Sequence, residues 1–301
     1  MEDISELWQQ NISRLLKAWD LNYNTDICNT RFMNGQHVIA LITGGCRGLG
    51  LEIALALNRR FKNIVIILVD IVDPPPSISK SYNNLIFHRC DITDTFQIFL
   101  LRKKILLDFG RIHILVNNAA VTSIKPLLKM SESEIQNLLT VNLIAAHHMI
   151  VIFLPDMKYN YQGCIVNIAS VLGELTPSRL IVYGASKAGL IQMHNSLGHK
   201  IKEFNSSYAV KGNTGLKAIL VCPGKISTTM FEDVQTPSKI LAPDLNPEVL
   251  AECIVKNICH NLTICIREPY YSKLIPLFKE LDQFFVNTLK IWSGMNDVTH
   301  I

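Results

Sequence analysis

The sequence predicts a doubly wound α/β domain, with helices on both faces of a parallel sheet. Short apolar runs rich in Val and Ile alternate with longer amphipathic stretches along most of the chain. A glycine-rich turn joins the first run to the first helical stretch, and polar residues gather just after several runs. Alternation of this kind is typical of a parallel sheet. Ligands of such sheets bind at the carboxyl ends of the strands.

The expected elements follow from the length and periodicity of each stretch. We expect strands at 37–42, 64–69, 85–90, 112–117, 163–169, 215–222 and 262–266, and helices at 48–60, 94–108, 131–154, 183–204 and 246–260. Together they form one domain over residues 36–268. The proline-rich segment that begins at Asp73 is expected to be a loop after the second strand.

Amphipathic extensions flank this domain at 1–35 and 269–301. In both, apolar residues recur at helical spacing, and lysines flank the apolar positions of the C-terminal tail. The tail pattern fits a helix lying on a membrane surface. It equally fits a helix that packs on the domain or on a second subunit. The high aromatic content of the tail favours membrane contact.

Composition excludes several classes of function. The chain has 301 residues, 49% of them apolar, and a net charge of +4 without a dense Lys/Arg run, so nucleic acid is not an expected partner. The eight cysteines form no C-x-x-C pair or Cys/His cluster, so we expect no metal site. We interpret them as reduced thiols of a cytoplasmic protein. No run reaches the roughly 18 apolar residues of a membrane span.

Three side chains predict an acid/base site. Tyr183 and Lys187 stand four residues apart in YGASK, and Ser170 lies thirteen residues before the tyrosine. On a helix, positions i and i+4 share one face. A nearby cation lowers the pKa of a phenol, ordinarily about 10, toward the working range. The serine hydroxyl suits holding an alcohol or carbonyl oxygen, because it both donates and accepts hydrogen bonds.

The glycine-rich turn predicts a dinucleotide site. It contains Gly44, Gly45, Gly48 and Gly50. Glycine lets the backbone approach a pyrophosphate, and the following helix presents its positive end to that anion. Asp70 ends the next strand-like run, where an acid can accept hydrogen bonds from ribose hydroxyls and repel a 2′-phosphate. Arg47 in the turn favours NADP(H) instead, because a cation there could contact a 2′-phosphate. We favour NAD(H) over NADP(H), because an acid at the ribose is harder to reconcile with the extra phosphate.

Further motifs complete a recognisable pattern. TGGCRGLG (Thr43–Gly50) matches T-G-x-x-x-G-x-G, NNAA (Asn117–Ala120) matches N-N-A-G except for its last residue, and PGKIST (Pro223–Thr228) matches P-G-x-x-x-T. Asp91 in CDIT matches an acid that contacts the adenine ring. Asn142, Ser170, Tyr183 and Lys187 match a catalytic tetrad. In this order, over about residues 37–267, the motifs resemble the short-chain dehydrogenase/reductase family.

The resemblance implies a Rossmann fold, bound NAD(P)(H) and named site residues. Asn142, Ser170, Tyr183 and Lys187 would be catalytic: the tyrosine moves a proton, the lysine lowers its pKa, the serine positions the substrate oxygen, and the asparagine holds a relay water. No metal is required. Contacts to the cofactor would come from Thr43, Gly44, Arg47, Gly48, Leu49, Gly50, Asp70, Asp91, Ile92, Asn118, Tyr183, Lys187, Pro223, Gly224, Ile226 and Thr228.

The function that the resemblance implies is hydride transfer to or from a lipophilic alcohol or ketone. The tail, with SGMND near its end, further resembles the retinol and hydroxysteroid dehydrogenase branch of the endoplasmic reticulum and lipid droplets, which implies lipid metabolism and peripheral membrane contact. We expect a homo-oligomer by analogy. The segment from Lys225 to Asn246 should cover the substrate. The alternative function is a dinucleotide-binding scaffold or sensor with little turnover, against which the intact tetrad speaks.

Overall fold

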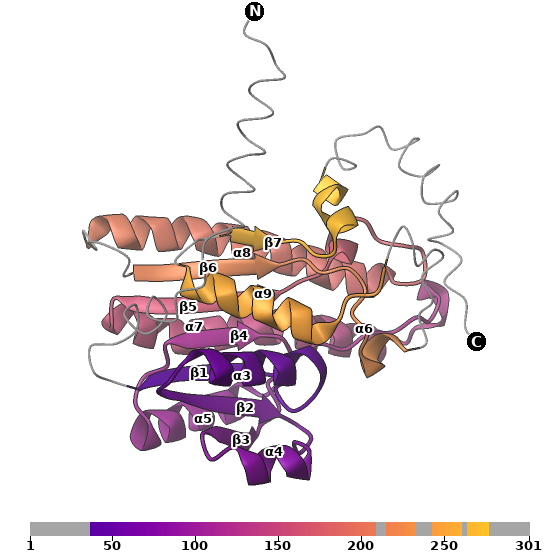
Figure 1. Ribbon diagram of the computed structural model, residues 1–301. Helices are drawn as coiled ribbons and strands as arrows, with labels where there is room; N and C mark the ends of the chain where they lie inside the picture. Colours follow the sequence, from indigo (N-terminus) through magenta and orange to yellow (C-terminus); the bar gives the residue numbers. More distant parts are fainter. Residues whose placement is uncertain (1–36, 209–214, 233–242, 261–263, 277–301) are drawn as a thin grey trace, which may run out of the picture.

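A computed structural model describes residues 37–208, 215–232, 243–260 and 264–276. Within these residues, seven parallel strands form one sheet in the order β3-β2-β1-β4-β5-β6-β7 (Figure 1). The strands are β1 (Val38–Thr43), β2 (Ile64–Asp70), β3 (Leu85–Arg89), β4 (Ile114–Asn117), β5 (Gln162–Ile168), β6 (Gly215–Val221) and β7 (Ile264–Ile266). The prediction of a doubly wound α/β fold is confirmed. The strand order reverses direction between β1 and β4, which is where such sheets form a ligand crevice.

Helices cover both faces of this sheet. They are α3 (Gly48–Arg60), α4 (Pro76–Ser81), α5 (Thr95–Asp108), α6 (Glu132–Leu139), α7 (Ala145–Tyr159), α8 (Ile181–Ser207) and α9 (Pro247–Cys259). Helices α3 and α9 lie on one face, and α5, α7 and α8 lie on the other (Figure 1). Within β1, Ala40 and Ile42 pack toward α3, whereas Ile39 and Leu41 pack toward α5 and α7. Burial on both faces explains why the strands read as continuous apolar runs.

Two helices differ from the sequence prediction. The proline-rich segment expected to be a loop contains α4, because Pro76 occupies its first turn, where a missing N–H costs nothing. The helix expected at 131–154 is divided by a π-helical turn, η2 (Thr140–Ile144). It then continues as α7 through Pro155 to Tyr159. Proline disfavours a helix interior but does not forbid it.

The stretch Glu132–Tyr159 also bears on the membrane question. Although no membrane span is expected from the sequence, this stretch is long and apolar enough to cross a membrane by composition alone. Core helices of soluble domains pass the same test. Met149, Phe153 and Met157 of α7 are fully buried in the core against β4 and β5. Packing in the domain therefore accounts for the apolar residues that face the sheet, whereas Ile144 and Val151 of the same stretch are 43% and 54% exposed.

The cysteines were expected to be reduced thiols. Among the described residues, six cysteines carry free thiols (Cys46, Cys90, Cys164, Cys222, Cys253 and Cys265). The expectation of reduced thiols throughout is wrong for Cys259, which is disulfide-bonded.

The N-terminal extension and residues 277–301 of the tail lie outside the described residues. The tail begins with the short helix η5 (Tyr270–Lys273), where Tyr271 packs so closely on Gly224 that a Cβ there would lie 1.9 Å from its Oη.

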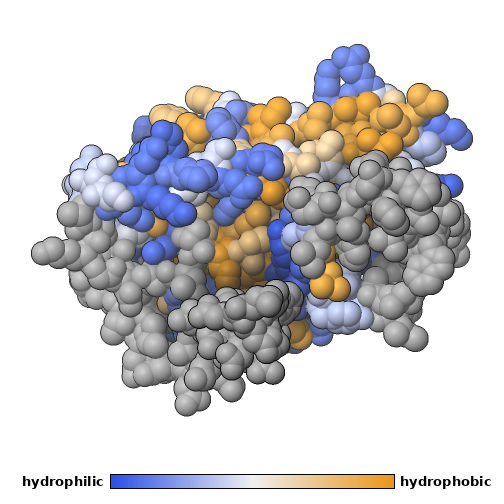
Figure 2. Space-filling view, turned by 90° about the horizontal axis from the view of Figure 1, so that it is seen from above, coloured by the Kyte–Doolittle hydropathy of each residue, from blue (hydrophilic) through white to orange (hydrophobic). Residues whose placement is uncertain are grey.

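The upper side of the molecule, as Figure 1 is drawn, exposes apolar surface. Here β7 forms the edge of the sheet and η5 lies beside it, and hydrophobic side chains gather between hydrophilic groups (Figure 2). Ile264, Tyr270 and Leu274 of these elements are 39%, 56% and 48% exposed. An oligomer partner or a membrane surface would each suit such a face. Both remain predictions.

Candidate active site

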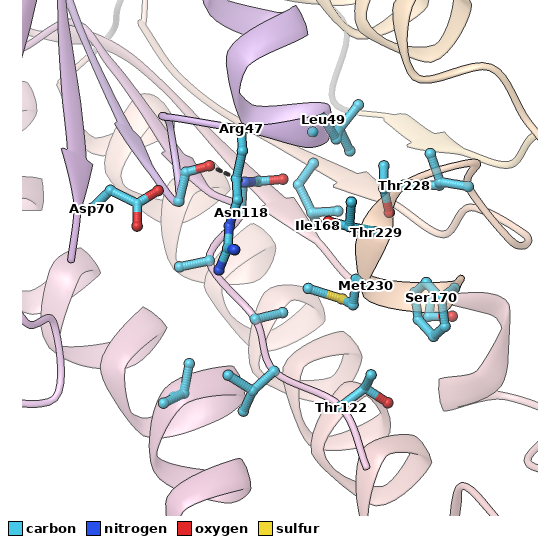
Figure 3. Close-up of a pocket in the computed structure, with 18 of the residues that line it drawn as sticks. Arg47, Leu49, Asp70, Asn118, Thr122, Ile168, Ser170, Thr228, Thr229 and Met230 are labelled. Carbon is cyan, nitrogen blue, oxygen red and sulfur yellow. Dashed lines mark hydrogen bonds between the residues drawn. The ribbon is translucent and has the colours of Figure 1, made fainter. Parts of the chain in front are cut away.

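A cavity of about 530 Å³ opens at the carboxyl ends of the central strands. Asp70 lies at one end of it and Ser170 lies at the other (Figure 3). The fold brings most of the expected site residues to this one cavity. Its lining includes Gly44, Arg47, Gly48, Leu49, Asp70, Asp91, Ile92, Asn118, Ser170, Tyr183, Lys187, Pro223, Gly224, Ile226 and Thr228. Thr43, Gly50 and Asn142 do not line it.

The glycine turn between β1 and α3 exposes its backbone to the cavity, because glycine has no side chain. Gly44 and Gly48 have φ angles of +62° and +52°, which side chains other than glycine rarely adopt. A Cβ on Gly50 would lie 2.1 Å from the carbonyl oxygen of Gly44, so only glycine allows α3 to begin this close to the turn. No side chain caps the N-terminus of α3. Its first N–H groups can therefore face an anion, as a pyrophosphate site requires.

Thr43 and Asn118 hold this turn against β4 from behind. The Thr43 hydroxyl accepts hydrogen bonds from the backbone N–H of Asn118 at 3.0 Å and of Ala119 at 3.1 Å, and it donates to the carbonyl of Val116. The Asn118 side-chain amide donates to the carbonyls of Thr43 and Gly44, both at 3.0 Å. These bonds fix the shape of the cavity floor. Thr43 therefore supports the site from outside the cavity.

Acidic side chains mark the end of the cavity away from Ser170. The Asp70 carboxylate accepts hydrogen bonds from the backbone N–H groups of Cys46 (3.2 Å), Ile71 (2.8 Å) and Val72 (3.3 Å). The Asp91 carboxylate accepts from the N–H and hydroxyl of Thr93. Both acids are thus held in place by their own loops. Arg47 is exposed, and its side chain runs down beside Asn118 into the cavity (Figure 3).

At the other end, Ser170, Tyr183 and Lys187 come together from β5 and α8. Tyr183 and Lys187 lie one turn apart and are 4% and 2% exposed. The Lys187 ammonium donates to the carbonyl of Ile168 at 2.8 Å and lies 5.7 Å from the centre of the Tyr183 ring. The Ser170 hydroxyl accepts from the N–H of Leu172 at 3.1 Å and is hydrogen-bonded to the tyrosine.

The electrostatics of this group differ from the expectation in one respect. Burial raises the pKa of Tyr183, and the hydrogen bond with Ser170 only partly opposes that effect. Burial also lowers the pKa of Lys187 to about 8. The expected lowering of the Tyr183 pKa by Lys187 is therefore not found: burial sets the direction, and Ser170 supplies the opposing effect. At neutral pH, Tyr183 is a protonated phenol and most Lys187 side chains are ammonium ions.

Asn142 lies beside the cavity, in the π-helical turn η2. Its amide nitrogen donates to the carbonyl of Val121 at 2.9 Å and to the hydroxyl of Ser186 at 3.0 Å, while its oxygen accepts from the N–H of Val121 at 2.8 Å. The side chain thus ties the loop after β4 to α8. Asn142 also lines a second, small cavity of about 10 Å³ with Lys187. That volume is roughly the size that one water needs.

Residues 38–239 match the model of a family described as short chain dehydrogenase. The chain belongs to the short-chain dehydrogenase family. An uncharacterized oxidoreductase of Saccharomyces cerevisiae is 45% identical over 264 residues, which are 88% of this chain and 84% of that protein. Retinol dehydrogenase 10-B of Danio rerio is 31% identical over 237 residues, covering 70% of this chain and 68% of that protein.

A solved structure shows the same fold at lower identity. A metagenomic short-chain oxidoreductase in complex with NADP has a TM-score of 0.62 and 23% identity, covering 78% of this chain and 98% of its own. Membership of the short-chain dehydrogenase family makes this chain an oxidoreductase of the short-chain type, and the family binds NAD(P).

Sequence reasoning missed a mostly apolar part of the lining of this short-chain dehydrogenase near Tyr183. Val121 and Thr122 line the cavity from the loop after β4, and Met230 and Phe231 line it from the short helix η4 (Thr229–Phe231). The Phe231 ring packs edge to face on Tyr183, with ring centres 5.7 Å apart. One signal was present, because Met230 and Phe231 lie two and three residues after the end of the motif Pro223–Thr228. They also fall in the segment expected to cover the substrate.

Proposed function

We propose that this short-chain dehydrogenase transfers a hydride between NAD(P)(H) and a lipophilic alcohol or ketone, with Tyr183 as general acid/base. One observation carries the proposal. A single cavity extends from the glycine turn, whose backbone is exposed to it, to Ser170, Tyr183 and Lys187. A dinucleotide spans such a distance, and its reactive end would then face the phenol.

The residues present fit the cofactor. The positive φ angles of Gly44 and Gly48, the uncapped N-terminus of α3 and the acid at the end of β2 are the features that a dinucleotide cradle needs. The glycine turn would hold the pyrophosphate, and Asp70 would hold the adenosine ribose. The segment Pro223–Thr228 would hold the nicotinamide end. When bound, the cofactor supplies or accepts the hydride.

The side chains of the chain itself move the proton. In reduction, the Tyr183 hydroxyl donates a proton to the carbonyl oxygen of the substrate, and in oxidation the phenolate removes one from the alcohol. The raised pKa of Tyr183 favours the donor form at neutral pH. Ser170 holds the same substrate oxygen by a hydrogen bond. The Lys187 charge stabilises the phenolate left after donation, and a water in the small cavity beside Asn142 relays the replacement proton.

Asp70 supports a preference for NAD(H). Its carboxylate is held by three backbone N–H groups, so it cannot move away from a 2′-phosphate without losing them. Like charges at close range disfavour binding. Arg47, which reaches into the same cavity, supports NADP(H), as does the NADP bound to the related metagenomic oxidoreductase. We propose that the fixed acid outweighs the exposed arginine.

The apolar wall near Tyr183 supports a lipophilic substrate. Val121 and Phe231 pack on the phenol and, with Met230, give the cavity apolar walls, while Thr122 and Thr229 are the hydroxyl-bearing residues in the same two segments. The name of the Danio rerio relative, a retinol dehydrogenase, points in the same direction. A substrate with an apolar body and one reactive oxygen would place that oxygen at Ser170 and Tyr183.

The test combines cofactor titration with a substrate panel. NADH and NADPH are titrated against the protein, and the tighter cofactor is used to screen aliphatic, aromatic and steroidal ketones. Tyr183→Phe should lower turnover about 100-fold or more while the cofactor affinity stays within about twofold. Tyr159→Phe, at a tyrosine that is 68% exposed on α7, is the matched control and should leave turnover unchanged.

Two outcomes would count against the proposal. A Tyr183→Phe variant that keeps wild-type turnover would remove the tyrosine from the chemistry. A wild-type protein that binds cofactor but turns over no member of the panel would favour the scaffold or sensor function.

A further inference from the structure

A chain of three buried polar side chains crosses the core beneath the active site. Asn117 ends β4, Asn167 is its register partner in β5, and His194 lies on α8 two turns after Lys187. They are 5%, 0% and 5% exposed. The Asn117 amide nitrogen donates to Asn167 Oδ1 at 2.8 Å, and Asn167 Nδ2 lies 3.0 Å from His194 Nδ1. Polar groups in the core of a parallel sheet cost free energy unless all are paired.

The pairing fixes the direction of the chain. The amide nitrogen of Asn167 can only donate, so His194 Nδ1 is the acceptor; this requires a neutral ring, and burial lowers the pKa of His194 to about 4. The oxygen of Asn167 is then the acceptor for Asn117. This order leaves Asn117 with its own oxygen, Oδ1, which is buried and unpaired among the described residues. The chain therefore ends in a free acceptor.

That acceptor belongs to a residue that lines the small cavity beside the active site. The cavity, about 10 Å³, is bordered by Asn117, Asn142 and Lys187. One N–H of the Lys187 ammonium is used by the carbonyl of Ile168, and two remain. A water between them would accept from the lysine and donate to Asn117.

We propose that Asn117, held in this orientation by Asn167 and His194, is a positioning residue whose Oδ1 fixes a water against the Lys187 ammonium. The inference rests on the proposed function, because the water matters to the reaction only if Tyr183 and Lys187 move a proton. Asn117 touches neither substrate nor cofactor in this role. It acts through the water, which orients the ammonium toward the phenol and helps to keep it charged.

The variants separate this role from packing. Asn117→Leu removes the acceptor at nearly constant volume. His194→Leu removes the group that orients the chain, whereas His194→Gln keeps an acceptor for Asn167. Asn84→Leu is the matched control, because Asn84, directly before β3, donates to Asn58 Oδ1 of α3 at 2.7 Å, and neither residue lines the cavity. Thermal unfolding of each variant is measured beside its kinetics.

The kinetic readouts are kcat and its pH profile with the best substrate. Asn117→Leu and His194→Leu should lower kcat about tenfold or more, with cofactor affinity within about twofold of wild type. The limb of the alcohol-oxidation profile that reports Tyr183 should move to higher pH, because an ammonium without this water loses its proton more readily and the neutral amine does not stabilise the phenolate. His194→Gln should recover most of the rate, and Asn84→Leu should keep both rate and profile.

A crystal structure of the protein at a resolution that shows ordered water is the second arm. It should show a water within hydrogen-bond distance of both Asn117 Oδ1 and Lys187 Nζ, absent from Asn117→Leu. A wild-type structure without this water would overturn the inference whether or not a substrate is found. If wild type is active and Tyr183→Phe is not, but Asn117→Leu keeps the wild-type kcat and pH profile, the inference fails while the proposed function stands.

Discussion

The buried charge of Lys187 should make the stability of the protein depend on pH in a defined window. Burial lowers the pKa of this lysine from 10.5 to about 8 in the folded chain. Between these two values the unfolded chain binds more protons than the folded one, so the free energy of unfolding rises with pH. Below pH 8 the full cost of burying the charge is present. Above about pH 10.5 the cost is gone.

The size of the effect follows from the same two values. One pKa unit corresponds to about 1.4 kcal/mol, so the complete cost is roughly 3 kcal/mol. Between pH 7 and pH 10 most of it, about 2 to 3 kcal/mol, should be removed. The perturbation that isolates this cost is Lys187→Met, which keeps an unbranched apolar side chain of similar length without a charge.

The assay is urea unfolding of the wild type and of Lys187→Met at both pH values. Other titrating groups are present in both proteins and cancel in the double difference. From pH 7 to pH 10, the wild type should gain about 2 to 3 kcal/mol of stability relative to Lys187→Met. A double difference below about 1 kcal/mol, or one of opposite sign, would refute the reasoning. It would show that the folded protein solvates this ammonium nearly as well as water does.

Three further predictions test other parts of the site. Gly50→Ala should destabilise the protein by about 3 kcal/mol and weaken cofactor binding, because its Cβ would meet backbone at 2.1 Å; Gly198→Ala, with open space around it in α8, should be neutral or stabilising in the same unfolding assay. Asp70→Asn should raise NADPH affinity relative to NADH about tenfold or more in fluorescence titrations, and an unchanged ratio would contradict a role in cofactor choice. Phe231→Ala should raise KM for bulky ketones about tenfold without altering NADH affinity, since it removes an apolar wall; equal KM values would place the substrate elsewhere.

The positions of the site residues could be predicted from sequence because they depend on topology. Ser170, Asn118 and Asp70 each come directly at or after an apolar run. In a parallel sheet all such ends meet at one edge, so residues far apart in the chain converge without any knowledge of side-chain contacts. The glycine turn could be predicted from the sequence for a related reason. Its spacing encodes a backbone shape that only glycine permits.

Properties that depend on how deeply a side chain is buried could not be predicted from the sequence. The shift of the Tyr183 pKa is opposite to the expectation because desolvation of the phenol dominates it, and a spacing of four residues says nothing about solvent. The hydrogen-bonded chain of side chains from Asn117 through Asn167 to His194 could not be predicted from the sequence either. Each asparagine interrupts an apolar run, which was a usable signal, but their partner lies on a helix that only the packed fold brings into contact.

The Lys187 charge also discriminates between an enzyme and a scaffold that only binds the dinucleotide. A scaffold needs the glycine turn and an acid at the ribose, and neither requires a cation buried beside a phenol. The wild type keeps this charge at a cost of roughly 3 kcal/mol at pH 7. Lys187→Met removes that cost but leaves the carbonyl of Ile168 without its donor, a loss of about 1 to 3 kcal/mol. The variant should therefore be about as stable as the wild type at pH 7 and yet have lost turnover, because the phenolate has no cation beside it. A variant that is equally stable and equally active would show that the charge serves no step of the reaction.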